Sequence, residues 1–135
     1  MLSFPRHMWY TGYHHHALGK RANMGILIIR KQATPSDIAE MRTESGSFIK
    51  LAVDLEREIL AGGGELHADC EQALLLEGSK QNDIWGGDWF PDLQEVGFES
   101  LINIRPRQGN RGLELESPEL KKRFEAIVRN LLEVK

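Results

Sequence analysis

The sequence predicts a single α+β domain, with one mixed or antiparallel sheet covered on one face by two helices. Strand-like apolar runs are grouped in the middle of the chain, and helical patterns lie near its two ends. The length of 135 residues suits one ordinary domain. We expect the order of elements to be roughly β-α-β-β-β-β-α.

The first 23 residues differ in composition from the remainder of the chain. They hold four of the five histidines and three of the 17 basic residues, but no acidic residue. They also show no periodicity. We therefore expect residues 1–23 to be a disordered extension or the product of an upstream start site, and residues 24–135 to be the domain.

The composition excludes several classes of function. Without the extension, 14 basic and 20 acidic residues remain, which is a net charge of −6. A net acidic domain is a poor general binder of nucleic acid, because phosphate contacts reward positive charge. No apolar run approaches the roughly 20 residues that a membrane helix needs. Cys70 is the only cysteine, so no disulfide can form within the chain, which fits a cytoplasmic protein.

The domain is expected to begin with a strand and a helix. Residues 25–31, "GILIIRK", form a β-branched run that is apolar on both faces, as is typical of an interior strand. Thr34 can cap a helix in which Pro35 takes the first position, and Gly46 can end it. Residues 48–60 fit both helical spacing and alternation, and the glycines after them favour a strand.

The middle of the chain predicts further strands. Residues 65–76, "ELHADCEQALLL", alternate at first and then become continuously apolar, which indicates a long strand. The glycine-rich residues 61–64 would join this strand to 48–60 as a hairpin. In residues 84–92 we expect Pro91 to prevent a full central strand, which leaves an edge strand that could pair with a second copy of the chain.

A last strand and a clear helix are expected at the C-terminal end. Residues 98–106, "FESLINIRP", predict the strand. Ser117 can cap the helix, and Pro118 and Glu119 suit its first turn. Apolar residues then recur at helical spacing, at Leu120, Phe124, Ile127, Val128, Leu131 and Leu132.

The predicted hairpin gathers polar side chains on one face. With a period of two, Glu65, His67, Asp69 and Glu71 share that face, and Cys70 points to the apolar side as a small core residue. The face can be plainly solvated, since two exposed charges about 4 Å apart interact by only about 1 kcal/mol in water.

Two other interpretations of this face stay open. Arg105, Arg107 and Arg111 can neutralise it, either as a structural network or as a pocket for a small anionic ligand. Alternatively, His67 acts as a general base or metal ligand, although its spacing matches no recognised zinc motif.

Three stretches in order, "GGELHADCE", "LLLEGSKQNDIWG" and "SLINIRPRQGNR", resemble a family of small prokaryotic proteins, the domain of unknown function family 5674. The resemblance runs from about Met24 to the C-terminus and supports Met24 as the beginning of the domain. It implies no activity, because the family has no assigned reaction, and no catalytic role is carried over.

The sequence thus favours an uncharacterised cytoplasmic binding module for a small polar molecule or a protein partner. In this interpretation Arg105, Arg107, Asn110 and Arg111 meet the acidic face and hold the ligand. The alternative is an enzyme in which His67 is the base and Asp69 and Glu65 assist metal-assisted hydrolysis or phosphoryl chemistry. No particular cofactor and no dedicated metal site is indicated; a second copy of the chain is a candidate partner, and neither nucleic acid nor membrane is favoured.

Overall fold

The computed structural model describes residues 8–9, 25–42 and 46–135, which form an α+β domain on an antiparallel sheet. This confirms the predicted fold class. The strands are β1 (Met8–Trp9), β2 (Leu27–Ile29), β3 (Ile49–Asp54), β4 (Ile59–Gly62), β5 (Ile84–Phe90) and β6 (Glu95–Gly97). The helices of the described residues are α1 (Pro35–Met41), α2 (His67–Leu76) and α3 (Pro118–Leu132), and their short 3₁₀ turns are η3 (Gln81–Asp83), η4 (Leu101–Asn103) and η5 (Pro106–Gln108).

The sheet has the strand order β1-β2-β4-β3-β5-β6, and every neighbouring pair is antiparallel. Five of these strands, β2 to β6, belong to the predicted domain. Met8 and Trp9 add two further residues beside β2, where they pair with Ile28 and Leu27. The rest of the expected extension over residues 1–23 lies outside the described residues.

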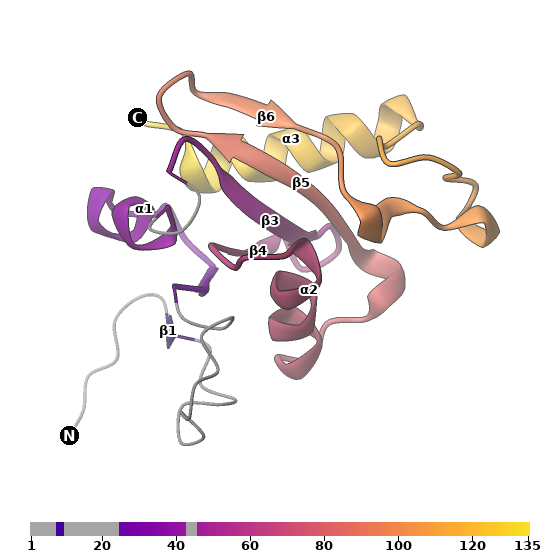
Figure 1. The fold of residues 1–135 in the computed structure, drawn as a ribbon, viewed down its shortest axis with the longest axis horizontal. Helices are drawn as coiled ribbons and strands as arrows, with labels where there is room; N and C mark the ends of the chain where they lie inside the picture. Colours follow the sequence, from indigo (N-terminus) through magenta and orange to yellow (C-terminus); the bar gives the residue numbers. More distant parts are fainter. Residues whose placement is uncertain (1–7, 10–24, 43–45) are drawn as a thin grey trace.

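Helices lie on both faces of the sheet, as Figure 1 shows with α3 behind β5 and α2 in front of β3. Two helices, α1 and α3, do share one face as predicted, and α2 covers part of the other. Alternate residues of β3 divide between the two cores: Leu51 and Val53 pack on the side of α3, whereas Ala52 packs on the side of α2. No helix in the described ranges is long and apolar enough to cross a membrane.

Two predicted helices form where their capping residues indicated. The Thr34 hydroxyl accepts a hydrogen bond from the Asp37 N–H at 3.1 Å, and the Asp37 carboxylate accepts one from the Thr34 N–H at 2.9 Å. At α3, the Ser117 hydroxyl accepts from the Leu120 N–H at 3.2 Å. Helix α1 ends at Met41, earlier than the expected stop at Gly46.

The segment 48–60 is extended, as favoured, but it contains two strands rather than one. Asp54 turns the chain between β3 and β4 because its Oδ1 accepts from the N–H groups of Glu56 and Arg57, both at 2.9 Å. Glu58 completes the turn with a φ of 57°. The turn contains no glycine, proline or asparagine, so the sequence offered few of the usual turn signals.

The predicted strand over residues 65–76 is wrong, because this segment is helix α2. Its buried residues are Cys70, Ala73 and Leu74, which follow the i, i+3, i+4 spacing of a helix. Leu66 and Leu76, whose apolar character supported a strand, are 60% and 59% exposed. The predicted hairpin therefore does not form, and β4 pairs with β3 and β2 instead.

The expectation of an edge strand at residues 84–92 is also wrong. Strand β5 lies between β3 and β6, and Pro91 comes directly after its last residue. Gly86 and Gly87 let other groups approach it closely: a Cβ at Gly86 would lie 2.6 Å from the Ser100 Cβ, and one at Gly87 would lie 2.3 Å from the Gly97 carbonyl oxygen.

Candidate functional site

The segment 98–116 between β6 and α3 is a long irregular loop, not the predicted strand over 98–106. It includes η4 and η5 and two isolated β-bridges. It lies beside the beginning of β5 (Figure 1, orange). Irregular segments of this length inside compact domains are usually functional or disordered. This one is held by buried side chains, and we call it the stapled loop.

Asn103 is the first of these side chains, and its surface is 0% exposed. Its Oδ1 accepts from the Gly86 N–H at 2.8 Å, and its Nδ2 donates to the Gly86 carbonyl at 2.9 Å. Nδ2 also lies 3.0 Å from the Leu113 carbonyl and 3.3 Å from that of Phe98. The amide thus bonds both backbone groups of Gly86, where β6 no longer pairs with β5. Because β6 does not extend to Gly86, the side-chain amide of Asn103 bonds the two backbone groups that a neighbouring strand would otherwise bond.

Asn110 is the second side chain that fixes the loop, with 2% of its surface exposed. Its Nδ2 donates to the carbonyls of Asn103 at 2.9 Å and of Gly112 and Glu114 at 3.0 Å. Its Oδ1 accepts from the Glu116 N–H at 2.8 Å. The amide predicted to hold a ligand therefore bonds the loop to itself.

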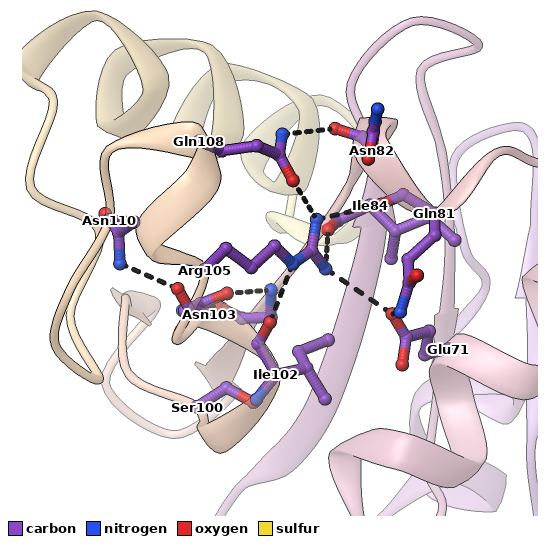
Figure 2. Close-up of polar contacts among 11 residues, drawn as sticks. Glu71, Gln81, Asn82, Ile84, Ser100, Ile102, Asn103, Arg105, Gln108 and Asn110 are labelled. Carbon is purple, nitrogen blue, oxygen red and sulfur yellow. Dashed lines mark hydrogen bonds and ion pairs between the residues drawn. The ribbon is translucent and has the colours of Figure 1, made fainter.

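Arg105 ties the stapled loop to the rest of the domain (Figure 2). Its guanidinium has five N–H donors, and each has an acceptor within the protein. These acceptors are the carbonyls of Ile102, Gln81 and Ile84, at 3.0, 2.8 and 2.6 Å, and the side chains of Gln108 and Glu71, at 3.2 and 3.4 Å. The guanidinium also lies 4.6 Å from the centre of the Trp85 ring. Burial lowers the pKa of Arg105, and the nearby Glu71 carboxylate partly offsets that effect.

The outer surface of the loop carries the two other arginines. Arg107 and Arg111 are exposed, and in the described part of the chain neither guanidinium is in an ion pair. The Glu116 carboxylate accepts a hydrogen bond from the backbone N–H of Arg111 at 3.1 Å. The same segment exposes three large apolar side chains: Leu101 is 76%, Ile104 44% and Leu113 43% exposed.

The polar residues of α2 are dispersed, because a helix turns them in different directions. His67 Nε2 lies 3.0 Å from both the Gly87 carbonyl and the Asp88 carboxylate. The Asp69 carboxylate accepts from the Leu66 N–H at 3.2 Å, and burial raises the pKa of Asp69.

The other two acids of the predicted face lie elsewhere. Glu71 contacts Arg105, and Glu65 is exposed. The strand face expected to carry Glu65, His67, Asp69 and Glu71 is thus absent. Among the described residues no three His, Cys, Asp or Glu side chains are arranged to hold a metal ion.

Cys70 lies in the core, as predicted. It is 0% exposed, and its thiol lies 3.5 Å from the Lys50 carbonyl oxygen. Burial raises the pKa of Cys70 to about 12, so the reactive thiolate is scarce at neutral pH.

Sequence reasoning missed Asn103 and the contact between Asp88 and His67. Asn103 stands between apolar residues in "LINI", and a polar residue in such a run is the signal that could have indicated a buried amide. Asp88 is a partner for His67 only because β5 passes the N-terminus of α2, and no sequence pattern indicates that contact.

These features define a small α+β domain in which the long loop between β6 and α3 is fixed by buried amides and an internally bonded arginine. Residues 27–131 match the family described as protein of unknown function, DUF5674, and the chain belongs to that family. Comparison with curated proteins and with solved structures gave no significant match.

Proposed function

We propose that the domain is a protein-binding module, that its contact surface is the stapled loop, and that its partner presents acidic groups around an apolar patch. One observation carries this proposal. The two buried amides and Arg105 are bonded within the domain, whereas Leu101, Ile104 and Leu113 and two arginines face solvent. Arginine and large apolar residues are enriched at the centres of protein interfaces.

The rigidity of the loop supports a binding role. Asn103, Asn110 and Arg105 together fix its backbone through buried or half-buried hydrogen bonds. A surface that is ordered before binding loses less conformational entropy when its partner arrives. Arg105 and Asn110 are accordingly positioning residues in this proposal, and Arg107 and Arg111 are the contact residues.

The exposed arginines favour an acidic partner. A free guanidinium can bind a carboxylate through two parallel hydrogen bonds. A small anion is less favoured as the ligand, since Arg105 and Asn110 already use their hydrogen-bonding groups inside the domain.

A charge-reversal experiment tests the proposal. A library of displayed peptides is selected against the domain, and we expect the enriched peptides to combine acidic and large apolar residues. The double variant Arg107→Glu, Arg111→Glu should weaken their binding by at least about tenfold. The control variant Lys31→Glu, Lys122→Glu changes the net charge equally at two exposed positions outside the loop.

The proposal also predicts where the peptides bind. Amide resonances of residues 101–113 should shift when a selected peptide is added. The proposal fails if the selected peptides have no acidic preference, if they bind the two double variants equally, or if the shifted amides lie on another surface.

A second candidate function, acid–base catalysis, is favoured by the contact between His67 and Asp88. Their side chains are 16% and 15% exposed, and the contact between Nε2 and the carboxylate is 3.0 Å. If Nε2 carries the proton that Asp88 accepts, Nδ1 is the basic nitrogen. Hydrolysis of p-nitrophenyl acetate and p-nitrophenyl phosphate by the wild type and by His67→Gln tests this candidate, which fails if the two proteins have equal rates.

A further inference from the structure

The face of the sheet that carries α2 is uncovered at one end. Asp88 lies on this face, because its neighbour Trp89 packs in the core on the opposite face. The first residue of α2, His67, reaches Asp88, with its Nε2 3.0 Å from the carboxylate. The last residue of β5, Phe90, lies beyond this contact, and Figure 1 shows α2 in front of β3 with the end of β5 clear of it.

Two aromatic side chains lie at this uncovered end. The rings of Phe48 and Phe90 stack with their centres 5.5 Å apart, and both residues are half-buried. On β6, Gly97 is the partner of Asp88 and adds no side chain that could cover them. A Cβ at Gly97 would lie 3.2 Å from the Phe90 ring and 3.3 Å from Asp88 Oδ2. The end of the face thus presents a partly exposed aromatic pair beside a carboxylate oxygen.

Further carboxylates flank the aromatic pair. Glu95 lies directly opposite Phe90 on β6 and is exposed. Glu65 is also exposed and precedes His67 by two residues. In the described ranges of the chain, neither Glu65 nor Glu95 is in an ion pair.

Negative charge is in excess around the two rings. The three carboxylates of Glu65, Asp88 and Glu95 stand against one ammonium, that of Lys50, whose Nζ lies 5.2 Å from the centre of the Phe48 ring. We call this surface the acidic–aromatic patch and define it by Phe48, Glu65, Asp88, Phe90 and Glu95.

The acidic–aromatic patch complements the stapled loop in charge and in apolar character. The loop exposes Leu101, Ile104 and Leu113 together with Arg107 and Arg111. Arginine binds carboxylates through two parallel hydrogen bonds and stacks on aromatic rings. The patch therefore offers the acidic groups and the apolar centre that the proposed function requires of a partner.

Within one chain the loop and the patch are held apart. Side chains of the loop bond Ile84 and Gly86 at the beginning of β5, whereas Phe90 ends that strand. Figure 1 accordingly shows the loop and the end of β5 on opposite sides of the molecule. The loop of one chain can therefore meet such a patch only on a second copy.

We propose that the partner of the stapled loop is a second copy of this chain, bound through its acidic–aromatic patch. This inference rests on the proposed function, because it keeps the loop as the contact surface and names the partner. The contact joins two different surfaces, so each pair of copies retains a free loop at one end and a free patch at the other. Copies joined in this way associate head to tail.

Two charge-reversal variants and their mixture test the proposal by sedimentation velocity over a series of protein concentrations. The wild type should associate, and more weakly at high salt, which screens exposed charges. Arg107→Glu, Arg111→Glu and, separately, Glu65→Lys, Glu95→Lys should each weaken association by at least about tenfold, because like charges then meet. An equimolar mixture of the two variants should associate again, since each loop finds a patch of opposite charge on the other variant.

A matched control and the peptide assay separate this inference from the proposed function. Glu58→Lys, Glu119→Lys reverses as many charges at two exposed positions outside the patch and should associate like the wild type. The inference is overturned if the wild type stays monomeric, if this control loses association equally, or if the mixture stays monomeric. A monomeric wild type whose loop still binds the selected acidic peptides would overturn self-recognition alone, and loss of peptide binding as well would overturn both proposals.

Discussion

The substitution Asn103→Ala should destabilise the stapled loop and the whole domain. In the native protein the Asn103 amide bonds both the N–H and the carbonyl of Gly86, at 2.8 and 2.9 Å. Alanine has no group that can replace either bond. The position is fully buried, so water does not readily reach the two orphaned groups.

The magnitude follows from counting the groups left without a partner. The carbonyls of Phe98 and Leu113 keep other donors, the N–H groups of Leu115 and Ser100, both at 3.1 Å. The N–H and the carbonyl of Gly86 lose the bonds from Asn103. At about 2 kcal/mol for each buried unsatisfied group, the free energy of unfolding should fall by about 4 kcal/mol.

Urea unfolding followed by tryptophan fluorescence measures this loss. With a slope of about 2 kcal/mol per molar urea, the midpoint should fall by about 2 M. Asn82→Ala is the matched control, since Asn82 is exposed and its loss should change stability by less than about 0.5 kcal/mol. A decrease below about 1 kcal/mol for Asn103→Ala would refute the structural role assigned to this amide.

Three further predictions concern other positions. Arg105→Lys should cost about 1 to 3 kcal/mol of stability and speed hydrogen exchange in residues 98–116, because lysine cannot supply five donors in one plane; unchanged exchange would contradict this. Gly87→Ala should cost about 1 to 3 kcal/mol in thermal unfolding, since its Cβ would lie 2.6 Å from the Phe124 ring; Gly112→Ala, with 3.5 Å to its nearest neighbour, is the control and should be nearly neutral. Cys70 should not react with Ellman's reagent at about pH 8 in the native protein but should react in urea, because burial raises its pKa to about 12; rapid native reaction would show that the thiol is accessible.

The fold class and the terminal helices could be predicted from the sequence because their signals are local. Thr34 with Asp37, and Ser117 with the apolar stripe after it, act within a few residues of the elements that they begin. Strand β2 was similarly indicated by its β-branched run. Such signals do not depend on what packs against the element.

Helix α2 and the stapled loop could not be predicted in the same way. Over residues 65–71 the sequence alternates, which is the pattern of a half-exposed strand, although the helix begins at His67. The helix is selected by the fit of Cys70, Ala73 and Leu74 against the sheet, which is a property of the tertiary structure.

The prediction of the candidate site depended on helix α2 and the stapled loop, the two segments whose structure could not be predicted from the sequence. Arg105 contacts Glu71, one acid of the predicted face, but that residue lies on a helix and the face itself does not form. The contact between His67 and Asp88 joins α2 to β5, through residues that lie 21 positions apart in the sequence. Contacts of this kind can be identified only from the tertiary structure.

The adjacent glycines of β5 make the sheet thin where the loop crosses it. On one face Ser100 and Ile102 come within 2.6 and 2.9 Å of where a Gly86 Cβ would stand, and on the other face Phe124 comes within 2.6 Å of the corresponding position at Gly87. A single layer of backbone therefore separates the loop from the C-terminal helix. Any side chain larger than hydrogen at either glycine would push the loop or the helix away from the sheet, so the packing on both faces depends on these two adjacent residues.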